Sequence, residues 1–346
     1  MKTEAAILVE TGGTLEIASL TIPPLKEGQV LVEIAYSGMC GSQVLEVCGG
    51  KGEDRWLPHC LGHEASGVVR ETGSGVTRVA VGDPVVVSWL KGPGIEAGGS
   101  VYDWNGRRVN AGAVTTFQRH ALVSENRVTR LPDGLPMDLA VLLGCAAPTG
   151  IGAVANVLKA ASGSSVAVFG VGGIGLHACM AAAFAGCAPV IAIDPNPDRR
   201  ALAGAFGATH VLDPAAGDPV EAVRALVAGG VDAAVEASGS PLAMRQAMEG
   251  CRAQGGRAVV IGNARFDAML SLSPALFNQG KSLLGTWGGD SRPERDFASF
   301  AKLLAAERFP VRRLLSAPYS LAEAGQALQD LAAGRVGRPL IDMSFG

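Results

Sequence analysis

The sequence carries little charge and does not concentrate it in one sign. Charged residues make up 18% of the 346 residues, the formal net charge is -3, and no cluster of lysine and arginine stands out. Binding to the phosphates of a nucleic acid requires such a cluster. Nucleic acid is therefore not an expected partner.

Charge is missing altogether from residues 166–193, a run long enough to cross a membrane as a helix. Glycines crowd residues 170–175, however, and Pro189 separates residues 190–193 from the rest, so a strand, turn, helix and second strand explain the run better. The N-terminus also lacks a basic stretch followed by an apolar core, as a signal peptide would have. We expect a cytoplasmic protein without a membrane partner.

The seven cysteines are an odd number in a long chain without an export signal, which favours reduced thiols over disulfides. Cys179, Cys187 and Cys251 lie beside apolar segments and are expected to be buried as small hydrophobic residues. No cysteine occurs between Cys60 and Cys145, which excludes a four-thiolate zinc site there.

Two patterns of secondary structure follow one another along the chain. Up to about residue 135, short β-rich runs separated by turns predict a barrel-like domain. From about 164 to 285, strands alternate with amphipathic segments, which predicts an α/β, doubly wound parallel sheet. Two helices and a last apolar run follow, and we expect them to return to the first domain. The predicted division is residues 1–147 with 287–346, and residues 148–286.

A glycine-rich turn lies between a predicted strand and a predicted helix, where backbone N–H groups can face a pyrophosphate. Asp194 lies 19 residues after Gly175, at the end of the next β-rich run. A carboxylate there can accept hydrogen bonds from both ribose hydroxyls of an adenosine, which favours NAD over NADP. Arg199 is a second candidate for contact with the ribose. The alternative interpretation is an arginine on the solvated face of a helix. The expected glycines are Gly170, Gly172, Gly173 and Gly175, with Gly262 after a later strand.

Cys40, His63 and Cys145 are candidate ligands of one catalytic zinc. Two thiolates and one imidazole form a three-ligand set that leaves a fourth position open. Taken singly, each cysteine is readily explained as a buried thiol and the histidine as a structural one. His59 and Cys60 form a rival local pair, but ligands of a catalytic zinc usually come from different loops, so we leave them out.

An ordered set of motifs makes the chain resemble the zinc-dependent medium-chain alcohol dehydrogenases nearly from end to end. The motifs are Gly38-Met-Cys-Gly-Ser42, Leu61-Gly-His-Glu64, Gly82-Asp-Pro-Val85, Gly144-Cys with Pro148-Thr-Gly150, Gly170 to Gly175, and Gly337-Arg-Pro. The resemblance implies a GroES-type catalytic domain with an inserted Rossmann domain, a catalytic zinc on Cys40, His63 and Cys145, and NAD(P)-dependent interconversion of an alcohol and a carbonyl compound. It also implies a homodimer or homotetramer.

The resemblance assigns roles to further residues. Ser42 corresponds to the hydroxyl that takes the substrate proton, and Glu64 to the carboxylate behind or transiently on the zinc. Thr149 and Ile174 correspond to neighbours of the nicotinamide, and Arg338 to a pyrophosphate contact. Trp89 and Trp287 fall where the family lines its substrate pocket, although ordinary packing explains either tryptophan equally well.

Three departures from the family pattern are visible. Gln43 stands where the family has aspartate, and it can accept the N–H of the zinc histidine but should raise its basicity less. Leu45 replaces a histidine of the proton relay. The polar, glycine-rich stretch 91–110 replaces the lobe that carries a structural zinc in many relatives. We expect a loop there that is ordered by packing or hydrogen bonds in place of a metal.

The predicted function is zinc-dependent, NAD-linked interconversion of an alcohol with an aldehyde or ketone. The polar stretch 91–110 hints at a polyol, cyclitol or sugar as the substrate. One alternative is a zinc-free NAD(P)H reductase of the same superfamily, and another is a non-catalytic nucleotide-binding protein. Retention of Cys40, His63 and Cys145 argues against the first, and retention of these ligands and Ser42 argues against the second.

Overall fold

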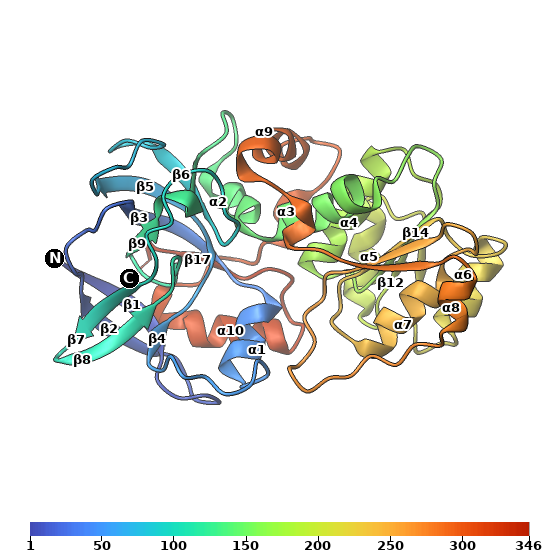
Figure 1. Cartoon of the computed structure of the whole chain (residues 1–346), viewed down its shortest axis with the longest axis horizontal. Coiled ribbons are helices and arrows are strands. Elements are labelled where there is room, and N and C mark those ends of the chain that lie inside the picture. The colour runs from blue at the N-terminus through green and yellow to red at the C-terminus, as the bar shows by residue number, and fades with distance from the viewer. Residues whose placement is uncertain (346) are drawn as a thin grey trace. The chain divides into compact units, whose positions relative to one another are not determined.

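The computed structural model describes residues 1–345, which form two compact units. Unit 1 consists of Met1–Cys145, Arg292–Ala306 and Val311–Gly346, and unit 2 of Ala146–Ser291 and Glu307–Pro310. Figure 1 shows their elements along the chain, from blue at the N-terminus to red at the C-terminus.

Unit 1 contains a small closed barrel and a six-stranded sheet. The barrel follows the order β1-β2-β7-β8-β4, and Ile7, Leu20 and Tyr102 lie in its core. Its strands are β1 (Lys2–Leu8), β2 (Glu16–Thr21), β4 (His59–Cys60), β7 (Ser100–Trp104) and β8 (Arg107–Ala111).

The second sheet of unit 1 carries the chain's C-terminal strand. It follows the order β10-β6-β5-β3-β17, with β9 also pairing with β3. Its strands are β3 (Gln29–Gly38), β5 (Glu64–Thr72), β6 (Pro84–Ser88), β9 (His120–Ser124), β10 (Val128–Arg130) and β17 (Leu340–Asp342). The helices of unit 1 are α1 (Gly41–Val47), α2 (Met137–Ala140), α9 (Pro293–Leu304) and α10 (Ala324–Ala332), with short 3-10 turns η1 (Glu125–Arg127), η2 (Val141–Gly144), η5 (Val311–Leu314) and η6 (Leu321–Glu323).

Unit 2 is a parallel sheet in the order β13-β12-β11-β14-β15-β16. In chain order this is 3-2-1-4-5-6, the doubly wound arrangement, whose strand order reverses between β11 and β14. The strands are β11 (Val166–Phe169), β12 (Val190–Ile193), β13 (His210–Leu212), β14 (Ala233–Glu236), β15 (Arg257–Val260) and β16 (Ser282–Gly285). The helical elements are α3 (Ala146–Gly152), the π-helix η3 (Ala153–Leu158), α4 (Gly173–Phe184), α5 (Pro197–Ala205), α6 (Pro219–Leu226), α7 (Pro241–Gly250), α8 (Ala275–Asn278) and η4 (Gly288–Asp290).

Three helices of unit 2 begin at a proline that follows a capping side chain. Asn196 accepts hydrogen bonds from two N–H groups of α5, and Asp218 and Ser240 each accept one at the start of α6 and α7. Proline fits the first helical position because it has no N–H to leave unpaired. These local signals explain why the predicted helices begin where they do. The predicted fold class, a barrel-like β-rich domain with a doubly wound parallel sheet, is confirmed.

The expectation of an irregular loop at 91–110 is wrong for its second half, which forms the hairpin β7–β8. Asn105 and Gly106 both have positive φ, as a tight turn between two strands requires. The first half is held by Glu125. Its carboxylate accepts N–H bonds from Ile95 at 2.8 Å and from Thr77 and Arg78 at 2.6 and 2.8 Å.

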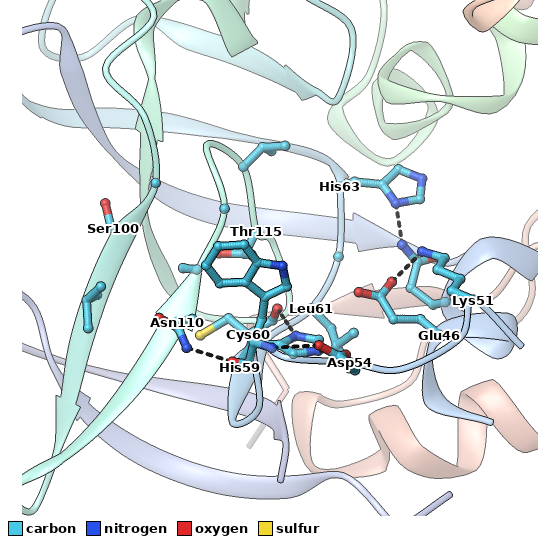
Figure 2. Close-up of a pocket in the computed structure, with 18 of the residues that line it drawn as sticks. Glu46, Lys51, Asp54, His59, Cys60, Leu61, His63, Ser100, Asn110 and Thr115 are labelled. Carbon is cyan, nitrogen blue, oxygen red and sulfur yellow. Dashed lines mark hydrogen bonds and ion pairs between the residues drawn. The ribbon is translucent and has the colours of Figure 1, made fainter. Parts of the chain in front are cut away.

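The hairpin also forms one wall of a cavity of about 700 Å³ in unit 1 (Figure 2). The other walls are the segment from Glu46 to His63 and residues 112–115. No single helix in residues 1–345 is long and apolar enough to span a membrane, although the bent pair Met137–Gly144 and Ala146–Leu158 meets the length and hydropathy criteria together.

Candidate metal centre and cofactor turn

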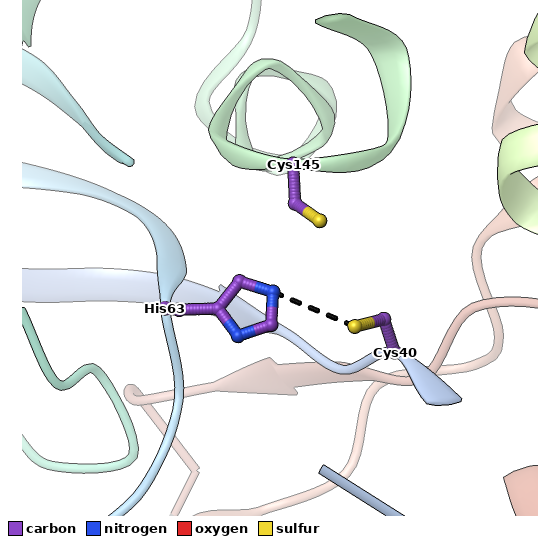
Figure 3. Close-up of side chains that lie close together, drawn as sticks. All are labelled: Cys40, His63 and Cys145. Atoms are coloured by element: carbon purple, nitrogen blue, oxygen red, sulfur yellow. Dashed lines mark hydrogen bonds between the residues drawn. The ribbon is translucent and has the colours of Figure 1, made fainter. Parts of the chain in front are cut away.

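The side chains of Cys40, His63 and Cys145 point into one common space (Figure 3). Their ligand atoms all lie within 4.8 Å of one another, and Cys40 Sγ is 3.4 Å from His63 Nε2. Zinc bonds of about 2.3 Å to sulfur and 2.0 Å to nitrogen in a tetrahedron place those two atoms about 3.5 Å apart. The donor types and their spacing therefore fit a zinc ion.

Each ligand is positioned by its neighbours in unit 1. Cys40 precedes α1, and its N–H donates to Gln43 Oε1 at 2.9 Å. His63 precedes β5, whose first carbonyl, that of Glu64, accepts a bond from Ser37 Oγ at 3.1 Å. Cys145 follows η2, and Ser88 Oγ donates at 2.8 Å to the carbonyl just before it. Three different loops thus converge on one point, as the sequence predicts.

The pKa values of Cys40, His63 and Cys145 are shifted in the directions expected of metal ligands that lie close together without a cation. A hydrogen bond from the Cys145 thiol and the nearby His63 lower the pKa of Cys40 well below its ordinary value. The Cys40 sulfur and burial in turn raise the pKa of Cys145 well above it. Burial acts to lower the pKa of His63, but the Cys40 thiolate and the Glu64 carboxylate together raise it. Zinc binds cysteine as the thiolate, so it would displace the proton of the hydrogen bond between the two sulfurs.

Glu64 lies outside this group, although the sequence listed it as a possible ligand. Its side chain is fully buried and forms an ion pair with Arg338 Nη2. Burial raises the pKa of Glu64, and the guanidinium opposes that rise. Glu64 Oε2 and Arg338 Nε have no hydrogen-bond partner among residues 1–345. The sequence assigned these two residues separately and did not predict that they pair.

The hydrogen bond between Gln43 and His63 runs in the opposite direction from the one predicted. The sequence predicts that Gln43 accepts a hydrogen bond from the histidine, but the structure turns the amide nitrogen, Nε2, toward Nδ1. The amide oxygen is occupied by the Cys40 N–H. With Nε2 donating, the imidazole proton must sit on its own Nε2, which is the atom that faces Cys40. Ligation through that atom requires the amide to turn.

His59 and Cys60, the rival pair of candidate ligands, have other partners in the structure. His59 Nε2 is 2.8 Å from Asp54 Oδ2, and its Nδ1 donates to the Cys60 carbonyl at 2.9 Å. Cys60 lies in the barrel core, where burial raises the pKa of its thiol to about 12. Neither residue joins the metal group. Among residues 1–345 all seven cysteines are free, and Cys179, Cys187 and Cys251 are buried as expected.

The predicted glycine-rich turn and Asp194 lie at the carboxyl edge of the unit 2 sheet, whereas Arg338, also predicted to contact the cofactor, lies in unit 1 and pairs with Glu64. Gly172 caps α4 without a side-chain hydrogen bond, unlike the caps of α5, α6 and α7. A Cβ at Gly175 would lie 1.9 Å from the Gly170 carbonyl, whereas one at Gly172 would meet only Arg199 at 4.0 Å. The turn is therefore tight at one end and open at the other, as a pyrophosphate site requires.

Asp194 is buried at the end of β12, next to this turn. Its Oδ2 accepts the Val171 N–H at 2.9 Å, and its Oδ1 accepts the Asn196 N–H at the same distance. Arg199 Nη1 lies 3.9 Å from Oδ2. The carboxylate is thereby fixed within the glycine-rich turn, where the sequence placed the ribose partner.

A buried glutamate that the sequence analysis did not single out lies on the neighbouring strand. Glu236 ends β14, and its Oε1 accepts the N–H groups of Ser238 and Gly239 at 2.7 and 2.8 Å. Gly262, expected in the cofactor set, donates its N–H to the Glu236 carbonyl at 3.1 Å. Glu236 thus holds both loops that follow β14 and β15 at the edge where the strand order reverses.

The remaining predicted residues divide between the units. Ser42, on α1, and Trp89, after β6, are both half-buried in unit 1. Thr149 on α3 is buried, Ile174 on α4 is half-buried and Trp287 is 73% exposed, all in unit 2. Trp89 does not line the cavity of Figure 2. Substrate contact by either tryptophan stays a prediction.

Comparison with known proteins now decides the family. Residues 26–133 match the model of the alcohol dehydrogenase GroES-like domain, and residues 173–306 match that of the zinc-binding dehydrogenases. Alcohol dehydrogenase 1 of Zea mays is 31% identical over 99% of this chain and 98% of its own length. The chain belongs to the medium-chain dehydrogenase/reductase family.

Solved structures of the family agree over the whole chain. Benzyl alcohol dehydrogenase from Acinetobacter calcoaceticus superposes with a TM-score of 0.88 at 29% identity, covering 99% of both chains. A zinc-binding dehydrogenase from Sinorhizobium meliloti 1021, solved with NADP, gives a TM-score of 0.80 at 25% identity and 99% coverage of both chains. As a member of the medium-chain dehydrogenase/reductase family, the chain is an oxidoreductase.

Proposed function

We propose that this oxidoreductase uses one zinc ion and NAD to interconvert an alcohol, primary or secondary, with its aldehyde or ketone. The observation that carries the proposal is the convergence of Cys40, His63 and Cys145, two sulfurs and one imidazole nitrogen within 4.8 Å. Three protein ligands leave a position for a substrate oxygen, whereas a structural site would supply a fourth ligand.

Zinc held by these residues supplies Lewis acidity, which lowers the pKa of an alcohol in the open position. Ser42, two residues after Cys40 on α1, is the proposed acceptor of the hydroxyl proton. NAD would supply the hydride acceptor, so that loss of a proton and a hydride would convert the alcohol to its carbonyl while NAD became NADH. Leu45 cannot carry the proton further. The proton therefore leaves Ser42 by way of the cofactor ribose, water or another group.

Unit 2 is the proposed cofactor domain and unit 1 the catalytic domain. The uncapped N-terminus of α4 offers N–H groups to the pyrophosphate, and Asp194 offers its carboxylate to the ribose. A 2'-phosphate would meet that negative charge, which supports NAD, although the Sinorhizobium meliloti relative was solved with NADP. Thr149, Ile174 and Arg338 keep their expected roles as cofactor neighbours.

The two rival functions are less well supported. A zinc-free reductase of the same family has no need to bring two cysteines and a histidine together, and a non-catalytic protein has no need of Ser42 beside them. A homodimer or homotetramer, a cytoplasmic location and the absence of a second zinc are part of the proposal, and seven free cysteines are consistent with a reducing compartment.

Metal analysis combined with an assay of NAD reduction tests the metal. We expect one zinc per chain and turnover of at least one alcohol, polyol or cyclitol. Cys40→Ser should lose zinc and at least about a hundredfold in kcat/KM, because the ion is held by fewer ligands. Cys48→Ser is the matched control, since this exposed cysteine lies at the other end of α1 from Cys40. Zinc-free protein with full activity would disprove the mechanism.

A second pair of variants tests the cofactor. Asp194→Asn removes the charge but keeps an acceptor oxygen, so the preference for NAD over NADP should fall by about tenfold or more. Asp198→Asn, on the exposed first turn of α5, is the control and should leave the preference as it is. An unchanged preference in Asp194→Asn would remove the ribose role.

A further inference from the structure

The cavity of Figure 2 is lined by one residue of the metal group, His63, and by its hydrogen-bond partner Gln43. The cavity of about 700 Å³ lies within the usual range for small-molecule sites. A ligand at this end of the cavity would therefore lie next to His63 and Gln43.

Charges in the cavity wall are paired. Lys51 Nζ is 2.8 Å from Glu46 Oε2, and His59 Nε2 is 2.8 Å from Asp54 Oδ2. The other ring nitrogen of His59, Nδ1, is 2.9 Å from the Cys60 carbonyl oxygen, so both nitrogens are engaged. The remaining charged groups of the wall, Glu53 and Arg108, are exposed. With its buried charges neutralised in pairs, the cavity suits a neutral ligand.

Two hydroxyl groups in the cavity wall can each form a further hydrogen bond. Thr115 is only 4% exposed, and its Oγ1 has no hydrogen-bond partner among residues 1–345. Ser100 Oγ accepts the Gln29 amide at 3.0 Å, which leaves the Ser100 hydroxyl proton for another acceptor. A buried hydroxyl without a partner is costly unless a ligand or water completes it.

An aromatic ring completes the wall. Trp56 is 59% exposed, and the Arg55 guanidinium lies 5.3 Å from its ring centroid, so one ring face is engaged and the other is free of that contact. The backbone of Trp56 is fixed, because its N–H donates to Asp54 Oδ1 at 2.9 Å and its carbonyl accepts the Asn110 amide at 2.6 Å.

We propose that this cavity binds the hydroxylated part of a neutral polyol or cyclic polyol, which makes such compounds the substrate class of the enzyme; this rests on the function proposed above. The C–H face of a polyol packs against an indole ring while its hydroxyls bond to Thr115 and Ser100. An alkyl or aromatic alcohol would leave Thr115 Oγ1 unpaired. A phosphorylated substrate would find only exposed Arg108 without an acidic partner in the wall.

Substrate pairs that differ only in hydroxyl number provide the test. The zinc-loaded enzyme is assayed with myo-inositol against cyclohexanol, and with xylitol against 1-pentanol. The wild type should favour the hydroxylated member of at least one pair in kcat/KM. Thr115→Val, which replaces the hydroxyl by a methyl group of similar size, should reduce that hydroxylated-to-deoxy ratio about tenfold. Trp56→Leu should reduce it by a similar factor.

Controls separate recognition from folding. Thr115→Ser keeps the hydroxyl and should restore the ratio, and Thr77→Val makes the same chemical change at an exposed threonine outside the cavity and should leave it unchanged. Calorimetric titration of the zinc-loaded protein with myo-inositol and xylitol, without NAD, measures binding independently of turnover. Thr115→Val should weaken that binding by about the same factor.

The outcomes distinguish this proposal from the function on which it rests. Turnover of cyclohexanol and 1-pentanol in preference to the polyols, or a ratio unaffected by Thr115→Val, would overturn the polyol site and leave the dehydrogenase function standing. Polyol binding that depends on Thr115, without NAD reduction from any alcohol, would support the site and overturn the dehydrogenase function. Tighter binding of inositol 1-phosphate than of myo-inositol would overturn the neutral-ligand assignment.

Discussion

Gln43 determines which nitrogen of His63 carries the proton. Its oxygen accepts the Cys40 N–H, and its nitrogen faces His63 Nδ1. Zinc ligation through Nε2 requires a proton on Nδ1 and an acceptor beside it. A glutamine can supply that acceptor only by turning its amide, which sacrifices the bond to Cys40. An aspartate supplies an acceptor oxygen in either orientation.

We therefore expect Gln43→Asp to bind zinc about 10 to 100 times more tightly than the wild type, because a carboxylate raises the basicity of the imidazole. Competition with a chromophoric chelator measures the dissociation constant. Gln279→Asp, at an exposed position in unit 2, is the control for the added charge. Equal affinities in Gln43→Asp and the wild type would show that the amide already serves as well as a carboxylate.

Zinc binding should also release protons. The lowered pKa of Cys40 favours a thiolate at this sulfur, whereas the raised pKa of Cys145 favours a thiol whose proton zinc must displace. The pKa of His63 is raised as well, so a second proton is displaced at lower pH. We expect about one proton released at alkaline pH and nearly two in mild acid, with affinity falling about tenfold per pH unit for each.

Calorimetry of zinc binding in buffers of different ionisation enthalpy counts these protons. Cys145→Ser supplies the comparison, because a serine hydroxyl gives up no proton at these pH values. Release of no proton near neutral pH would mean that both sulfurs are thiolates before the metal binds.

At the scale of elements, Glu125 orders the first half of the stretch 91–110. Its carboxylate accepts three backbone N–H bonds, which join residues 77–78 to Ile95. Burial acts to raise the pKa of Glu125, but these three bonds lower it overall. The stabilisation is therefore fully present above the unfolded pKa of about 4.5 and is lost as the pH falls through the lower folded value.

Glu125→Gln should lower the free energy of unfolding by about 1–3 kcal/mol, because one acceptor oxygen becomes a donor facing an N–H group. The loss should be the same with and without a chelator and should shrink below about pH 4. Denaturant unfolding at several pH values measures it. Glu96→Gln, at a more exposed ion pair of the same segment, should cost less than about 0.5 kcal/mol. A loss that disappears on chelation would instead connect Glu125 to the metal.

Elements marked by local signals could be predicted from the sequence. The proline-capped helices and the apolar strands of unit 2 carry such signals, as do the three ligands beside glycines. The hairpin β7–β8 was missed because its turn, Asn105-Gly106, lies in a polar, glycine-rich stretch, and β7 joins β2 only through the distant pair Thr21 and Asp103. The amide orientation of Gln43 and the unpartnered Thr115 depend on side-chain packing across the barrel, which no local pattern encodes.

For the whole molecule, the division into units separates the two proposed ligands. All three zinc ligands lie in unit 1, and Cys145 is the last residue before the chain enters unit 2. Asp194 and the glycine-rich turn lie entirely within unit 2. Each ligand therefore stabilises mainly the unit that binds it, by an amount set by its concentration relative to its dissociation constant.

We expect two overlapping thermal transitions, of which zinc raises one and NAD raises the other. A ligand at about one hundred times its dissociation constant adds about 2.7 kcal/mol, which corresponds to a rise of roughly 5–10 °C for a unit of this size. Differential scanning calorimetry of the metal-free, zinc-loaded and NAD-bound protein measures the shifts. Cys40→Ser should abolish the zinc shift and keep the NAD shift, whereas a single transition raised equally by both ligands would mean that the two units unfold as one.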